Sequence, residues 1–336
     1  MNKNLSETFD FLRFPLAVLV VFLHISPVIS TFDTHYYCNN YEKAYLFLNM
    51  GINKISNCAV PIFFFISGYL IVANINHLTL KIYFRKLKSR FWTLFVPYVL
   101  WNVLALGYLF ITKQLENSIT FSYIFIKPAN FPLWFIRDLM CLVISFPLFY
   151  YGYKFLGKYL AILILGSFLL YVGPSMETRF ILIPICFWGF GMYCGMRRYE
   201  LDSIDNYIKL SICFIALILL FIELIFNGQI AMILDNTLLV FGSFAIIILG
   251  HYIVKYTSFR FTEILTASSF FIFCCHKLGP TYIAKSGIRF ITMDPVQEQI
   301  IVFLICPFIS VLICILIYRF GKKSFPQLLN ILTGGK

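Results

Sequence analysis

Charged residues are scarce in this sequence. They make up 12% of its 336 residues, whereas hydrophobic residues make up 60%. A soluble domain carries close to a quarter of charged residues, so the composition excludes an ordinary soluble enzyme. The apolar residues come in runs of about 20, the length of a membrane-spanning helix, and not in the alternating strands of about ten residues that build a β-barrel. The sequence therefore predicts an all-α fold, a polytopic membrane helical bundle.

The motifs of several enzyme classes are also missing. The sequence has no HExxH, no CxxC and no cluster of carboxylates, so a metal site is poorly supported. Neither a GxSxG elbow nor a P-loop occurs. The ten cysteines predict no disulfide framework, because most lie inside apolar runs as small buried hydrophobes. The first apolar segment is too long for a signal peptide, and no small-residue cleavage site follows it.

The net charge of +12 is explained by topology rather than by nucleic-acid binding, because the basic residues lie in short loops between apolar runs. On the side of the N-terminus fall 18 of the 27 Lys and Arg residues, and eight fall on the other side. The positive-inside rule therefore predicts that both termini are cytoplasmic. We expect one domain over residues 1–336, with about ten transmembrane helices at 9–29, 55–75, 91–111, 132–151, 158–173, 179–196, 208–226, 237–256, 261–278 and 299–319.

The first span, FDFLRFPLAVLVVFLHISPVI, contains two costly residues, Arg13 and His24. Ionisable groups inside a bilayer mark functional sites by default. Their spacing of eleven residues places them roughly 20° apart on one helix face and about 16 Å apart along it. Two plainer interpretations remain open: an arginine that reaches the headgroups, and a buried histidine bonded to a neighbour. Three other histidines, His35, His77 and His251, lie in loops or at span ends, and we interpret them as structural or solvent-facing.

Three further stretches place polar groups within the spans. VPIFFFISGYL contains Ser67, Gly68 and Tyr69, and its proline and glycine predict a kink or a close approach of a neighbour or ligand. FPLWFIRDL and SSFFIFCCHKL supply an aromatic, a cation and a second histidine. On the predicted topology, four residues share one depth in the outer half of the bilayer: His24, Trp134, Arg137 and His276. If they converge, they supply a base and cations able to stabilise an oxyanion.

The most basic segment is residues 76–90, which we expect to be a cytoplasmic loop with the cations Lys81, Arg85, Lys86, Lys88 and Arg90. A topology signal explains it by itself. The alternative is an anion site for a phosphorylated cofactor.

Four stretches, taken in order, resemble the acyltransferase-3 family of integral membrane acyltransferases. DFLRFPLAVLVVFLH resembles the family's signature of Arg or Lys, ten residues and His. VPIFFFISGYL resembles its second-helix motif, PLWFIRDL its Leu-Trp-Phe motif, and SSFFIFCCHKL its late Ser-to-His segment. The similarity covers nearly the whole chain and is to the small stand-alone type, such as the O-acetyltransferases of the enterobacterial common antigen.

The resemblance implies an O-acetyltransferase of the bacterial inner (plasma) membrane. It would move an acyl group, usually acetyl, from cytoplasmic acetyl-CoA to a hydroxyl of a cell-surface glycan or glycolipid. The catalytic residues would be His24, the general base, and Arg13. Cofactor binding would fall to Arg85, Lys86, Lys88, Arg90, Ser67 and Tyr69, and acceptor binding to Trp134, Arg137 and His276.

Two departures and two alternatives accompany the resemblance. Larger members carry a glutamate-rich segment after the Leu-Trp motif and an extra-cytoplasmic domain, whereas this chain has Arg137 and Asp138 there and lacks the domain. The main alternative is a membrane transporter or flippase that uses the same buried Arg and His residues, although no inverted repeat is evident. A membrane domain that senses a ligand without chemistry is the third.

Overall fold

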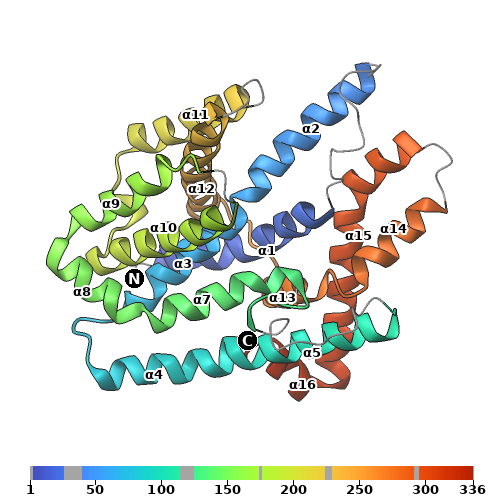
Figure 1. The fold of residues 1–336 in the computed structure, drawn as a ribbon, viewed down its shortest axis with the longest axis horizontal. Helices are drawn as coiled ribbons and strands as arrows, with labels where there is room; N and C mark the ends of the chain where they lie inside the picture. Colours follow the sequence, from blue (N-terminus) through green and yellow to red (C-terminus); the bar gives the residue numbers. More distant parts are fainter. Residues whose placement is uncertain are drawn as a thin grey trace. The chain divides into compact units, whose positions relative to one another are not determined.

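The computed structural model describes residues 3–25, 40–113, 125–173, 176–223, 229–290 and 295–335. Within these ranges the regular structure is helical and contains no strand, which confirms the all-α prediction (Figure 1). The chain divides into two compact units. The first comprises Met1–Arg13, Asn57–Phe91 and Asp138–Phe261, and the second comprises Phe14–Ser56, Trp92–Arg137 and Thr262–Lys336.

The first unit contains the start of α1 (Lys3–Ile25) and most of the middle of the chain. Its other elements are α3 (Ala59–Val72), α4 (Leu80–Arg90), α8 (Phe146–Leu156), α9 (Lys158–Leu169), α10 (Met176–Arg197), η4 (Leu201–Ser203), α11 (Asn206–Glu223) and α12 (Gln229–Tyr256). The rest of α1 belongs to the second unit, with α2 (Asn40–Asn57), η2 (Phe91–Phe95), α5 (Val96–Ile111), η3 (Phe131–Leu133), α13 (Glu263–Cys275), α14 (Pro280–Arg289), α15 (Pro295–Ser324) and α16 (Pro326–Leu332). Helix α7 (Trp134–Ile144) crosses the boundary.

Among the described residues, seven helices are long and apolar enough to cross a membrane, or eight if a bent pair counts as one span. The pair is Phe131–Ile144 with Phe146–Leu156, and its halves meet at 58°. Of the ten expected spans, α9 and α13 are only 12 and 13 residues long, against the roughly 20 that a straight crossing needs. The number ten is therefore not confirmed, and the cytoplasmic placement of the termini remains a prediction.

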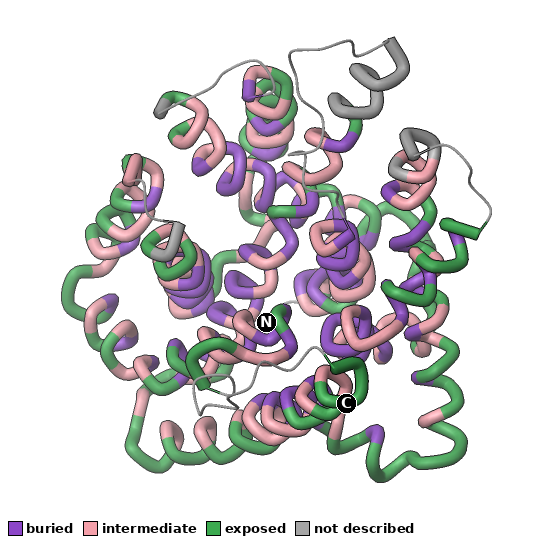
Figure 2. Tube along the Cα trace, turned by 45° about the vertical axis from the view of Figure 1, so that its right-hand side comes forward, coloured by how far each residue is buried: buried purple, intermediate pink, exposed green. Residues whose placement is uncertain are grey.

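The outward faces of these helices suit a membrane. Along most helices in Figure 2, buried positions alternate with exposed ones. Many exposed positions carry large apolar side chains, among them Phe214 and Phe221 of α11 and Phe308 and Leu316 of α15. Such side chains have a suitable partner in lipid, and helices satisfy their own backbone hydrogen bonds there.

The basic segment 76–90 was expected to be a loop, but it is largely a helix. Helix α4 begins after Thr79, whose hydroxyl accepts a hydrogen bond from the amide of Ile82 at 3.3 Å. It continues through a π-helical turn, η2, into α5. A polar residue in the N-cap position and basic residues in the last turn are helix signals. Apolar periodicity did not reveal this helix, because α4 carries no buried residue.

Helices α3 and α10 pack closely through glycines, as the sequence predicted for Gly68. A side chain at Gly68 would collide with the backbone of Trp188, and one at Gly191 would collide with the backbone of Phe65. Small residues let helix backbones approach in membranes. The close neighbour of Gly68 is therefore the backbone of another helix.

Candidate active site

His24 lies in the last turn of α1, with one ring nitrogen bonded and the other open. Its Nδ1 lies 2.9 Å from the carbonyl oxygen of Val20, one turn earlier. Since a carbonyl only accepts, Nδ1 must carry the hydrogen, which leaves the lone pair on Nε2. This Nε2 is buried and has no hydrogen-bond partner among the described residues. A buried, unpartnered basic nitrogen is the form in which a histidine acts as a general base.

His276, directly after α13, repeats this arrangement. It is fully buried, its Nδ1 lies 3.0 Å from the carbonyl oxygen of Ile272, and its Nε2 also lacks a partner in the described chain. The ring centroids of His24 and His276 are 5.1 Å apart, with an angle of 81° between the ring planes. The structure therefore brings together two predicted site residues that are 252 positions apart.

The turn after α13 holds His276 in place. The amide and the hydroxyl of Thr281 both donate to the carbonyl oxygen of His276, at 3.0 and 2.8 Å. The same hydroxyl lies 3.1 Å from that of Ser310 in α15. Gly279, with φ of +138°, makes the turn possible, because L-residues rarely adopt this conformation.

The segment before α7 completes the surroundings of the pair, and the sequence did not single it out. The ring of Phe131 lies 5.8 Å from that of His24, centroid to centroid, and the Lys277 ammonium lies 5.4 Å from the Phe131 centroid. Asn130 is buried, and its side-chain amide donates to the carbonyl oxygen of Cys274 at 2.7 Å. Its Oδ1 has no partner in the described residues. The available signal was an asparagine with Phe-Pro after it, just before the Leu-Trp motif.

Trp134 and Arg137 lie at the start of α7 in the same unit as the histidine pair. The Arg137 guanidinium donates to the carbonyl oxygen of Ile126. Their convergence on the histidines stays a prediction.

The remaining predicted site residues belong to the first unit. Arg13 forms an ion pair with Asp10, one turn earlier, at 2.9 Å. The hydroxyl of Tyr69 donates to the carbonyl oxygen of Tyr199 at 3.1 Å. Ser67, two residues before Tyr69, is half-buried. Of the predicted cofactor-binding cations on α4, Arg85 and Lys88 are exposed, whereas Lys86 and Arg90 are half-buried.

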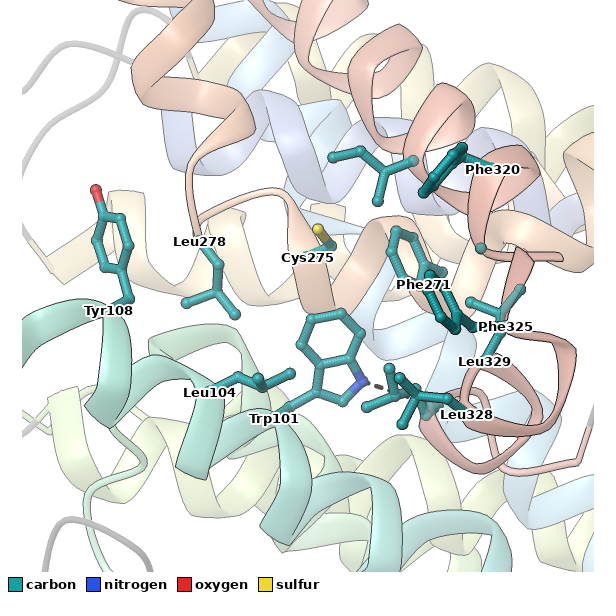
Figure 3. Close-up of a pocket in the computed structure, with 13 residues that line it drawn as sticks. Trp101, Leu104, Tyr108, Phe271, Cys275, Leu278, Phe320, Phe325, Leu328 and Leu329 are labelled. Atoms are coloured by element: carbon teal, nitrogen blue, oxygen red, sulfur yellow. Dashed lines mark hydrogen bonds between the residues drawn. The ribbon is translucent and has the colours of Figure 1, made fainter. Parts of the chain in front are cut away.

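A separate apolar cavity of about 410 Å³ lies in the second unit between α5, α13, α15 and α16 (Figure 3). Trp101 forms part of its wall, and its indole N–H is satisfied by the carbonyl oxygen of Leu332 at 3.0 Å. Cys275, the neighbour of His276, also contributes to the wall. The lining is suited to hydrocarbon and supplies no acid or base. No described group of three or more His, Cys, Asp or Glu side chains could hold a metal ion.

Comparison with known proteins identifies the family of this chain. Residues 7–319 match the model of a family described as Acyltransferase domain, the acyltransferase-3 family. The chain belongs to this family. It is thus a membrane acyltransferase, and the predicted family, enzyme class and membrane character are confirmed. The chain is also 24% identical over 374 aligned residues to the succinoglycan biosynthesis protein ExoH of Rhizobium meliloti, covering 100% of this chain and 94% of ExoH. No solved structure matches.

Proposed function

We propose that this acyltransferase moves an acetyl group from cytoplasmic acetyl-CoA to a hydroxyl of a cell-surface glycan or glycolipid, with His24 as the general base. The observation that carries the proposal is the buried, unpartnered Nε2 of His24, whose lone pair is set by the bond from Nδ1 to Val20. The match to the acyltransferase family supports the transfer of an acyl group, and the similarity to ExoH, a succinoglycan biosynthesis protein, supports a polysaccharide acceptor.

The reaction balances with one base. The acceptor hydroxyl gives its proton to Nε2 of His24 while its oxygen attacks the thioester carbonyl carbon. The carbon–sulfur bond then breaks, and the coenzyme A thiolate takes the proton back from the imidazolium. The products are the O-acetyl ester and free coenzyme A. The carbonyl of Val20 stabilises the imidazolium through the Nδ1 hydrogen, as a carboxylate does in a catalytic triad.

For cofactor binding, we propose the same residues that the sequence analysis predicted. The basic side chains of α4, Arg85, Lys86, Lys88 and Arg90, would bind the coenzyme A phosphates, because clustered cations favour phosphate. Arg13, Ser67 and Tyr69 would orient the rest of the cofactor. Trp134, Arg137 and His276 would bind the acceptor.

The predicted orientation supports a donor taken from the cytoplasm. The excess of Lys and Arg on the side of the termini is typical of a cytoplasmic face, and it contains α4. We infer that the protein lies in the bacterial inner membrane, where coenzyme A on one side and glycan precursors on the other are both accessible.

The test is acetyl transfer by the purified full chain in lipid nanodiscs, with labelled acetyl-CoA. We expect His24→Ala to lower turnover about 10²- to 10⁴-fold, the usual contribution of a general base. His77→Ala, at an exposed position between α3 and α4, is the matched control and should retain turnover. Near-normal transfer by folded His24→Ala would refute the assignment, and uptake of label into liposomes without acylation would favour a transporter.

A further inference from the structure

Three acceptors are among the buried polar atoms of the second unit that no described residue satisfies: Nε2 of His24, Nε2 of His276 and Oδ1 of Asn130. They belong to one neighbourhood. The two histidine rings are 5.1 Å apart, centroid to centroid. Asn130 is tied to both, since its neighbour Phe131 contacts the His24 ring and its own amide is bonded to Cys274, two residues before His276.

All three atoms are acceptors, and none can change its role by rotation or tautomerisation. The hydrogen-bearing nitrogen of each side chain already donates to a backbone carbonyl, those of Val20, Ile272 and Cys274. Buried acceptors without a donor are costly, and native structures leave few of them. Among the described residues these atoms lack several donors, which a ligand can bring.

One reacting hydroxyl does not supply all of these donors. It carries a single hydrogen, which in the proposed reaction goes to Nε2 of His24, so His276 and Asn130 still lack a donor. A sugar ring supplies further hydroxyls on adjacent carbons, each with one hydrogen to donate. A lipid with a single primary alcohol does not supply these further hydroxyls.

We propose that His276 binds a second hydroxyl next to the one that is acylated, so that the acceptor is a vicinal diol of a sugar ring. This inference rests on the proposed function and identifies its substrate class. His276 then determines specificity: it accepts the hydrogen of the neighbouring hydroxyl, while His24 takes the proton of the reacting one. Oδ1 of Asn130 accepts from a further hydroxyl of the same ring.

The first experiment varies the acceptor and leaves the protein intact. The full chain in nanodiscs free of sugar detergents is given labelled acetyl-CoA and one of two alcohols, trans-1,2-cyclohexanediol or trans-1,4-cyclohexanediol. Both offer two equivalent hydroxyls on the same ring. We expect kcat/KM to be roughly three- to tenfold higher for the 1,2-diol, the effect of one additional hydrogen bond. Equal kcat/KM values would overturn the proposal.

The second experiment locates the preference in the protein. His276→Phe fills the space of the imidazole without an acceptor and should bring the ratio of the two diols close to one, through KM more than kcat. His276→Gln restores an acceptor at the position of the ring edge and should recover part of the ratio. Asn130→Val removes the acceptor for a further hydroxyl, which neither diol carries, and should leave the ratio of the two diols nearly unchanged. An unchanged ratio in folded His276→Phe would overturn the proposal.

Two further results separate this inference from the proposed function. If the wild-type protein acetylates neither alcohol, the function fails, and diol binding is measured instead by saturation-transfer NMR. A signal for the 1,2-diol above that for the 1,4-diol, lost in His276→Phe, then supports the inference, and equal signals overturn it. Activity lost with EDTA and restored by Zn²⁺ would show that the two Nε2 atoms hold a metal ion, which also overturns it.

Discussion

The two units each contain a buried histidine site, and the sites differ in how completely they are satisfied. In the first unit, His251 is 2% exposed, and both ring nitrogens have partners: Nδ1 lies 3.2 Å from the hydroxyl of Thr8, and Nε2 lies 3.2 Å from a carboxylate oxygen of Asp202. In the second unit, His24 and His276 each keep an open Nε2 among the described residues. Burial alone therefore does not separate a structural histidine from a reactive one.

The environment of Asp202 shows what the closed site does. Its carboxylate also accepts hydrogen bonds from Lys255 at 2.6 Å and from Asn4 at 3.4 Å. These contacts join α1, η4 and α12, three elements far apart in the sequence. A fully satisfied polar network makes a structure rigid, whereas a buried polar group left unsatisfied in a native protein is explained by strain, by a catalytic role or by a bound water or ion. From this comparison we propose that the His251 site serves stability and the His24 site serves chemistry.

The largest expected effect is a reciprocal one. His24→Ala should lower turnover about 10²- to 10⁴-fold and leave the melting temperature almost unchanged. His251→Ala should retain turnover per folded molecule but lose about 1–3 kcal/mol of stability, since Asp202 and Thr8 lose a buried partner. Turnover and thermal unfolding, measured on both variants in the same nanodiscs, check this. Equal losses of turnover in the two variants would contradict the comparison.

The next effect concerns the carboxylate. Asp202→Asn should destabilise the protein by about 1–3 kcal/mol, because it removes the negative charge that His251 and Lys255 share. The control is Glu7→Gln, which removes the exposed ion pairs of Glu7 with Lys3 and Arg260 and should cost less than about 1 kcal/mol. Both are read from denaturant unfolding. A control as damaging as Asp202→Asn would show that the His251 site is an ordinary surface pair.

Acid should weaken the closed site selectively. The hydrogen bond from Lys255, with those from His251 and Asn4, lowers the pKa of Asp202 to about 2 from its usual 3.8. A carboxyl with a lowered folded-state pKa stabilises the protein above its unfolded pKa, and this stabilisation is lost as the pH falls through the folded pKa. Unfolding scans should therefore show a loss between about pH 4 and pH 2. The Asp202→Asn protein should lack that component of the loss.

The smallest expected effect is at Arg13, near the middle of α1. The Arg13–Asp10 pair is half-exposed, and such pairs contribute about 0–1 kcal/mol. If Arg13 orients the cofactor, Arg13→Gln should raise the KM for acetyl-CoA several-fold with little change in stability, whereas Asp10→Asn should leave that KM nearly unchanged. Steady-state kinetics with varied acetyl-CoA make the measurement. Equal KM values in both variants would restrict Arg13 to a structural role.

Much of the protein was predictable because it depends on local properties of the chain. The length and apolarity of each run predict membrane helices, and the spacing of Arg13 and His24 on one helix follows from helical geometry. The ordered motifs predicted the acyltransferase family, which the match over residues 7–319 confirms. By contrast, the helix α4 was taken for a loop because its residues are basic and unburied, and α9 and α13 are shorter than the spans expected there.

The sequence by itself determined the membrane class, the family and the presence of a histidine deep in the first helix. Only the tertiary structure decided which histidine keeps an open ring nitrogen among the described residues. The partners of His251 are Thr8 and Asp202, and the neighbours of His24 are His276 and Phe131. All of these lie far from their partner in sequence, and no local pattern records them. The physical reason is that transfer into lipid is a property of each segment, whereas hydrogen-bond satisfaction is a property of packing between segments.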